Sequence, residues 1–505
     1  MRPAPLLLAL ALAGCLAPSA PPSPPGGPAG PVAADWHVRA LPFGEGHNHS
    51  SPAEHANLST PNFRVLGWDP LPTDLYQGAG AGGYFCGEAA QTAEGRRLAV
   101  VGSFSSDVAF VVSDVTDPAH PTTVGEYALP GVHVYDVAIT RDGLHVAVGT
   151  NPEPPALPIP LLGAGPRGVQ PMVRSCGSGW RAAGPEQQLP LAPGVVLVGV
   201  ADPANPVFED FAPTPVIGPH SVSTADVDGA QYVLASITNL QHQASYFTLF
   251  EVTATPLGPK LVELSTYQAP PPGPNVALVN GHVDGSIQKH PLDGKVYAYL
   301  ADWDAGVIIV DITNPRTPIQ VSQWTDYTGP GPLDSGDATG AIHDALPIEG
   351  LWDEKHYTLA GQELGGRPQN RPSGWVHILD TTDPANPQLV GQWVLPVDVQ
   401  WDSFLMFSTH YIDVVNRTLF VSMYHGGVWA VDLSGNLSAP KTLGVFEPTN
   451  VPAIPAAHAA DGWTPDVLQA IALPTGDLVV YDDSTGLYVV RFDPTVDVPP
   501  VGPWA

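Results

Sequence analysis

The sequence predicts an all-β fold, a seven-bladed β-propeller of four-stranded antiparallel blades, from three observations. One phrase recurs along the chain: an apolar β-rich run, a short polar turn that often contains proline, and a second apolar run. Glycine (52) and proline (59) are abundant, and helical periodicity is hard to find after the signal-like first residues. An incomplete copy of the phrase near the carboxyl end is matched by a spare strand near the amino end.

The copies lie 50–85 residues apart, a spacing that indicates a repeat architecture. They are residues 110–127, 195–211, 249–264, 307–324, 375–393, 428–446 and the half-copy 487–493. Two further short strands precede each copy. In the fourth unit, for example, the predicted strands are residues 285–289, 296–301, 306–311 and 319–324. Four antiparallel strands per unit, in seven units, are the pattern of a propeller.

Closure of the ring requires an outer strand for the last unit. The half-copy 487–493 has no outer strand after it, because a proline-rich tail (494–505) follows. Residues 62–68 (NFRVLGW) look like the outer strand of the other units, as in QLVGQW of the fifth. We therefore predict that this amino-terminal strand pairs with the last blade and closes a propeller spanning residues 62–493.

The runs VIIVDITNP and HILDTTDPANP resemble the LVIVD repeat of bacterial and archaeal surface proteins. The resemblance extends over roughly residues 62–493 and implies a β-propeller. Repeats of this kind specify a fold better than an activity.

Residues 1–15 form a predicted secretory signal, too short to span a membrane as a helix. The last four, Leu12-Ala13-Gly14-Cys15, resemble a lipobox, which implies cleavage before Cys15 and lipidation of that cysteine. The alternative is an ordinary cleavable signal. Residues 16–61 read as a Pro/Ala/Gly-rich tether with a histidine-containing segment. We expect an extracytoplasmic lipoprotein, in the periplasm or at the cell surface, anchored to the membrane through Cys15.

The charge balance bears on partners. The chain has 49 acidic and 19 basic residues, a formal net charge of −30, so a nucleic-acid partner is not expected. We expect a monomer that binds a protein or small-molecule ligand.

Polar residues recur at one structural position, at or near the start of each predicted inner strand. Symmetry should gather them at the mouth of the central channel, on the face called the top here. They are Glu88, His133, His220, His282, His343, His410 and Asp466. Loops at this face add Asp302, Asp304, Glu363, His425, Asp482 and Asp483.

Imidazole and carboxylate groups are the usual ligands of Cu, Fe and Zn, so this ring predicts a transition-metal site. The alternative is structural: the histidines cap strands by hydrogen bonding to neighbouring blades.

Long loops, including residues 153–194, also map to the top face. Such loops commonly build a binding surface, so we expect a ligand or partner to bind there. The alternative function is a Cu- or Fe-dependent oxidase or oxygenase that uses the histidine ring. This alternative is an analogy at the level of the fold with carotenoid-cleaving oxygenases, which hold iron with four histidines on the axis of a propeller.

Two further features remain. Cys86 and Cys176 are the cysteines left after Cys15, and in an exported chain they are expected to form a disulfide. His47, His49 and His55 (GHNHSSPAEH) form a second candidate metal site, because alternate residues of an extended chain face the same side. Its alternative is a polar surface loop.

Overall fold

A computed structural model describes residues 59–72, 84–103, 108–129, 132–152, 193–214, 218–239, 244–269, 282–302, 305–325, 342–363, 375–396, 408–424, 426–448, 467–483 and 485–498. The described residues all belong to one compact unit, His37–Ala505. Among them, no helix has the length and apolar character needed to cross a membrane.

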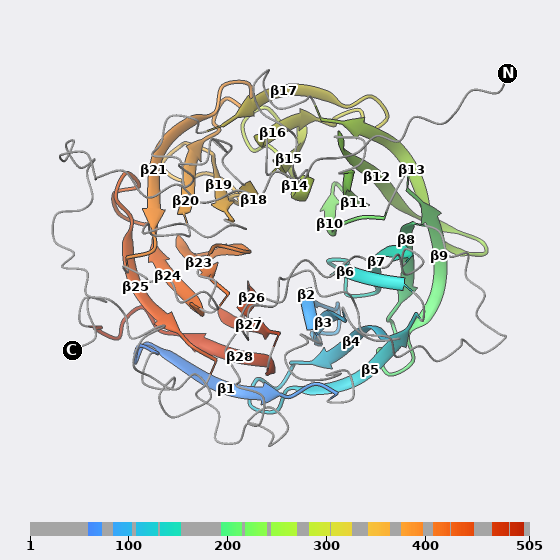
Figure 1. Ribbon diagram of the computed structural model, residues 1–505, viewed down its shortest axis with the longest axis horizontal. Helices are drawn as coiled ribbons and strands as arrows, with labels where there is room; N and C mark the ends of the chain where they lie inside the picture. The colour runs from blue at the N-terminus through green and yellow to red at the C-terminus, as the bar shows by residue number, and fades with distance from the viewer. Residues whose placement is uncertain are drawn as a thin grey trace, which may run out of the picture. The chain divides into compact units, whose positions relative to one another are not determined.

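The strands of the described residues form seven four-stranded antiparallel sheets, which confirms the predicted propeller. The sheets stand as blades around a central axis, and each blade turns one strand toward that axis (Figure 1). In blade order, the inner strands are β2 (Tyr84–Gln91), β6 (Val132–Ile139), β10 (Ser221–Val227), β14 (His282–Lys289), β18 (Ile342–Pro347), β22 (Ile412–Val415) and β26 (Val467–Ala472).

The other strands follow outward from the axis. The second strands are β3 (Arg97–Ser103), β7 (His145–Pro152), β11 (Ala230–Asn239), β15 (Val296–Asp302), β19 (Tyr357–Gln362), β23 (Thr418–Ser422) and β27 (Asp477–Asp482). The third are β4 (Val108–Asp114), β8 (Gly194–Gly199), β12 (Ala244–Thr255), β16 (Gly306–Asp311), β20 (Trp375–Asp380), β24 (Val428–Asp432) and β28 (Gly486–Phe492). The outer strands are β5 (Thr122–Ala128), β9 (Val207–Pro213), β13 (Gly258–Gln268), β17 (Ile319–Trp324), β21 (Gln388–Val394), β25 (Lys441–Phe446) and, for the seventh blade, β1 (Phe63–Asp69).

The third strands explain why the recurring phrase is so apolar. In β16, Val307, Ile308 and Ile309 are all fully buried, although successive side chains of a strand point to opposite faces. Both faces are covered because a neighbouring blade packs on each side. A continuous apolar run is therefore the sequence signature of a strand in the middle of a blade.

The amino-terminal strand closes the ring as predicted. Strand β1 pairs antiparallel with β28, with Phe63 opposite Phe492 and Asp69 opposite Leu487. In Figure 1 it lies along the outside of β28. The segment just before it also holds the sixth blade: Thr60 donates its N–H to the carbonyl of Val445 at 2.8 Å and accepts the Val445 N–H at 2.9 Å. Residues 60–69, called the clasp below, therefore bind both the sixth and the seventh blade.

Side chains of the inner strands link each blade to the next around the channel. The carboxylate of Asp344 accepts the N–H of Ile412 at 3.0 Å, and that of Asp413 accepts the N–H of Ala472 at 2.6 Å. At the junction of the last and first blades, the side chain of Gln469 accepts the N–H of Gly87 at 3.0 Å. These bonds fix the inner strands that carry the candidate site.

Candidate metal centre

Two neighbouring blades bring three potential metal ligands together at the top of the channel. His343 lies in β18 and Glu363 directly follows β19, both in the fifth blade, while His410 lies just before β22 in the sixth. One ligand atom from each residue lies within 4.8 Å of the other two. This group, called the triad below, unites two residues of the predicted ring with one of the predicted loop acids.

Local backbone geometry explains how His343 reaches this position. The pairing of β18 with β19 shifts register between Ile342 and Asp344, so His343 is the extra residue of a β-bulge. A bulge re-aims a side chain that regular pairing would hold in the sheet.

The triad is compact and shielded from water. The Nε2 atom of His343 lies 3.7 Å from Oε2 of Glu363, and the rings of His343 and His410 have centroids 4.2 Å apart. The exposed fractions are 2% for His343, 3% for His410 and 6% for Glu363. The Nδ1 atom of His343 is buried without a hydrogen-bond partner in the described part of the chain.

A backbone carbonyl fixes the tautomer of His410. Its Nδ1 atom lies 2.8 Å from the carbonyl oxygen of Leu468. Because a carbonyl can only accept, Nδ1 carries the proton and Nε2 keeps its lone pair. Metal-binding histidines are typically oriented by a hydrogen bond of this kind.

Both histidines of the triad are neutral at neutral pH. Burial lowers the pKa of His410 to about 3. Burial, together with the nearby imidazoles of His410 and His220, lowers the pKa of His343 well below its usual value. Neutral imidazoles offer the lone pairs that a metal ion needs, so the protein requires no proton release from these rings before binding.

The distances suit a small metal ion after slight side-chain movement. Ligand atoms about 2.1 Å from a tetrahedral ion lie about 3.4 Å from one another. The 3.7 Å separation of His343 and Glu363 is close to that value. Two imidazoles and one carboxylate are a ligand set used by zinc and by non-haem iron, and the set leaves coordination positions open.

The other predicted site residues fall into three groups. His220 is partly exposed at the start of β10 and lies near enough to His343 and His410 for its charge to affect both pKa values. His133 and His282 lie in β6 and β14, but their side chains are outside the description. Asp466, Asp304, His425, His47, His49, His55, Cys15 and Cys176 lie outside the described residues.

Cys86 sits behind the triad as a free, buried thiol. It has no exposed surface, packs with Tyr411 and Tyr424, and its Sγ atom lies 4.0 Å from Nδ1 of His410. Burial raises the pKa of Cys86 well above its usual value, so the group is a neutral thiol. The predicted disulfide with Cys176 is not shown: Cys86 is a free cysteine, and Cys176 lies outside the described residues.

Glu88 lies apart from the triad, in a cavity of about 860 Å³ formed by the inner strands. Asp136, Asp284, Asp344 and Asp413 line the same cavity. Burial raises the pKa of every one of these five carboxyl groups, that of Glu88 to about 8. Glu88 is therefore mostly protonated at neutral pH, whereas Asp413, whose pKa is raised to about 6, is mostly ionised.

The ring of Tyr411 lies between the triad and this cavity. It stands edge-on to His343 and His410, with centroid distances of 5.0 and 4.8 Å, and it also lines the cavity.

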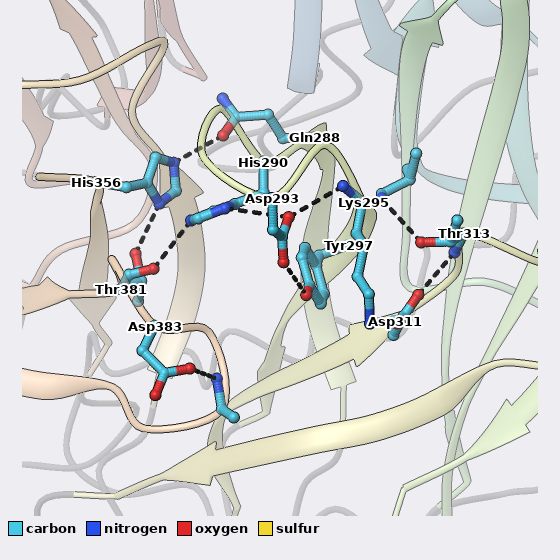
Figure 2. A network of polar contacts seen from close by, with 12 residues as sticks. Gln288, His290, Asp293, Lys295, Tyr297, Asp311, Thr313, His356, Thr381 and Asp383 are labelled. Atoms are coloured by element: carbon cyan, nitrogen blue, oxygen red, sulfur yellow. Dashed lines mark hydrogen bonds and ion pairs between the residues drawn. The ribbon is translucent and has the colours of Figure 1, made fainter.

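A second buried histidine pair shows what a structural arrangement looks like in this protein. His290 and His356 have ring centroids 4.7 Å apart between the fourth and fifth blades (Figure 2). The nitrogens of His356 contact the side chains of Thr381 and Gln288 at 2.9 and 2.8 Å. His290 contacts the carbonyl of Thr381 at 3.2 Å and the carboxylate of Asp293 at 3.3 Å. Protein groups therefore occupy both ring nitrogens of His356. Nδ1 of His290, like Nδ1 of His343, is buried without a hydrogen-bond partner among the described residues.

Sequence reasoning missed Tyr424, whose hydroxyl donates a hydrogen bond to Oε1 of Glu363. A signal was available: Tyr424 follows the second strand of its blade, where Asp302, Glu363 and Asp482 end or follow theirs.

One family model matches a segment of the chain. Residues 294–326 match the LVIVD repeat family. The chain carries an LVIVD repeat. The matched segment contains β15, β16 and β17, three strands of the fourth blade, so the LVIVD repeat coincides with the recurring sheet unit.

No curated protein matches the chain. The LVIVD-repeat propeller is similar to the Myceliophteria thermophila Cps50 (Swd1) β-propeller domain, with 10% identity and a TM-score of 0.44 over 83% of this chain and 99% of that one. It is also similar to the Dos1 propeller, with 9% identity and a TM-score of 0.42 over 87% and 97% of the two chains. At these values the likeness carries no argument about function.

Proposed function

We propose that this LVIVD-repeat propeller binds a transition-metal ion at the top of its channel through His343, His410 and Glu363. The long loops of the same face then present a surface on which a ligand or partner protein binds near the metal. The observation that carries the proposal is the convergence of three buried ligand atoms within 4.8 Å, from two blades.

The electrostatics support this assignment. The depressed pKa values of the two histidines keep them available as neutral donors.

Elemental analysis of the purified protein tests the proposal. We expect close to one equivalent of Zn, Cu or Fe, or uptake of one equivalent of Zn²⁺ on titration. Changing His343 and His410 together to Ala should abolish binding while the β-sheet circular dichroism persists.

The matched control is His356→Gln, which alters a buried histidine elsewhere and should keep the metal. Absence of metal with no uptake on titration would refute the proposal. Loss of metal only after changing His47 and His49 would move the site to the amino-terminal segment.

The same proposal includes the cellular setting. Lipidation of Cys15 would anchor the protein to a membrane, outside the cytoplasm, with residues 16–61 as the tether. The anchor and the metal centre are independent, because each can be removed by substitution without the other.

A second candidate function is a Cu- or Fe-dependent oxidase or oxygenase. The favouring observation is the composition of the triad, because two histidines and one carboxylate leave coordination positions for substrate and oxygen. Catalysed oxygen consumption by the metal-loaded protein, lost in the double alanine variant, separates this function from binding alone.

A further inference from the structure

We infer that Tyr424 is a positioning residue that fixes Glu363 as a single-oxygen metal ligand and ties the metal centre to the seventh blade. The inference rests on the proposed metal site. It concerns a residue that is not itself expected to touch the metal.

The hydroxyl of Tyr424 determines which oxygen of Glu363 faces the histidines. It donates to Oε1, while Oε2 lies on the side of His343. A carboxylate that could rotate freely would present either oxygen, or both. With Oε1 engaged by a hydroxyl donor, Oε2 is the atom offered to a metal ion.

The backbone of Tyr424 adopts a conformation that the surroundings must enforce. Its φ is 49°, in the left-handed region that side chains other than glycine rarely occupy. Two hydrogen bonds with Val467 hold it: Tyr424 donates to the Val467 carbonyl at 3.0 Å and accepts the Val467 N–H at 2.9 Å.

The same stretch of the seventh blade also orients His410. The carbonyl of Leu468, the residue after Val467, accepts a hydrogen bond from Nδ1 of His410. The ring of Tyr424 packs against His410 with a centroid distance of 4.7 Å. The start of β26 thus sets the orientation of one ligand directly and of another through Tyr424, so the site is built by three consecutive blades.

A tyrosine that merely fills the core would make no difference to metal coordination once the fold is intact. The Tyr424→Phe substitution separates the two roles, since it removes one oxygen atom and keeps the ring. We expect Zn²⁺ affinity to fall about 10- to 100-fold, the effect typical of losing a group that orients a ligand. With Co²⁺ as the probe, we expect the visible absorption bands to shift, because the carboxylate is free to change its binding mode.

A double-mutant cycle with Glu363→Gln strengthens the test. In the Glu363→Gln protein, Tyr424→Phe should cause little further loss of affinity, because the two residues act through one contact. The matched control is Tyr481→Phe, which removes another buried tyrosine hydroxyl, bonded to the carbonyl of Glu88 at 2.9 Å, and should leave affinity and spectrum unchanged.

The outcomes are distinct. Wild-type protein that binds no metal refutes the proposed function, and this inference with it. Wild-type protein that binds, with a folded Tyr424→Phe variant of equal affinity and unchanged Co²⁺ spectrum, refutes the inference alone. If Tyr424→Phe does not fold, the crystal structure of the Zn²⁺-loaded wild-type protein decides. Oε2 of Glu363 on the metal with Oε1 still bonded to the Tyr424 hydroxyl supports the inference, and a bidentate or unbound Glu363 overturns it.

Discussion

Burial sets the protonation state of the single residues around the channel axis. It keeps His343 and His410 neutral and able to bind a cation, and it keeps the carboxyl group of Glu88 in the neighbouring cavity mostly protonated at neutral pH. Both effects arise because a charged group loses hydration in a site walled by seven inner strands. Residues of the same type at the outer rim, such as Asp117, have the opposite shift: its pKa is lowered by a hydrogen bond from His120.

Glu88 provides a test at this scale. Its folded-state pKa is about 8, above the ordinary glutamate value of 4.5, so between these pH values the folded state binds a proton that the unfolded state has lost. The resulting stabilisation is present below pH 4.5 and disappears as pH rises through 8. Each unit of pKa difference corresponds to roughly 1.4 kcal/mol. We expect urea denaturation to show a free energy of unfolding that falls from pH 5 to pH 8.

Glu88→Gln supplies the comparison, since an amide resembles the protonated acid and does not titrate. In this variant the fall in stability over the same pH range should be smaller. An unchanged pH dependence would show that Glu88 is not the titrating group.

At the scale of the elements, the turn after each third strand packs against the outer strand of the previous blade. Small residues at one position of the outer strands receive it. Gly125 and Gly391 approach the carbonyls of Pro203 and Leu437 so closely that a Cβ would overlap them. In β13 and β17 the position is serine, and each hydroxyl donates to a proline carbonyl of the next blade at 2.6 Å. The recurring segment therefore forms part of a sheet and also packs neighbouring blades together. This contact between blades is called the interlock below.

Gly391→Ala tests this interlock. The added methyl group meets the rigid carbonyl of Leu437, so the fifth and sixth blades must separate or distort. We expect destabilisation of about 3 kcal/mol, the upper range for overpacking a close contact. The matched control is Gly435→Ala, where the nearest atom to a new Cβ is 4.0 Å away. The stability of both variants is measured by thermal unfolding. Equal melting temperatures for the two variants would contradict the interlock.

At the scale of the whole molecule, ring closure depends on a segment far from the last blade in sequence. Strand β1 covers the edge of β28, and Thr60 and Asn62 bond to the sixth blade. Phe63 is buried between these two blades against Phe446 and Phe492. Without this segment, β28 would be an open edge with unpaired backbone groups.

A chain that starts at Pro70 should therefore be less stable than one that starts at Ala56, which keeps the clasp. We expect the melting temperature to fall by several degrees or more, and size-exclusion chromatography to show aggregates formed through the exposed edge. A Pro70-start protein that is monomeric and as stable as the Ala56-start protein would show that the clasp is dispensable.

The fold was predictable because the same pattern of strands and turns recurs along the chain, so each copy supports the assignment of the others. Four strands of the fourth blade were expected at 285–289, 296–301, 306–311 and 319–324, and they occur at His282–Lys289, Val296–Asp302, Gly306–Asp311 and Ile319–Trp324. The closing strand was expected at 62–68 and occurs at Phe63–Asp69. Apolar alternation and turn residues are local properties, so a sequence displays them directly.

What the sequence alone determined is the seven-fold repeat, the strand that closes it and the gathering of His343 and His410 at one position of adjacent units. Only the tertiary structure decided which of the predicted groups meet. Glu363 joins the two histidines because it directly follows the end of a second strand. Tyr424 contacts Glu363 from a left-handed backbone conformation held by Val467, whereas Glu88 lies apart, in the cavity. The reason is physical: symmetry fixes where a backbone position lies around the axis, whereas bulges, hydrogen bonds to neighbouring blades and burial fix where its side chain points.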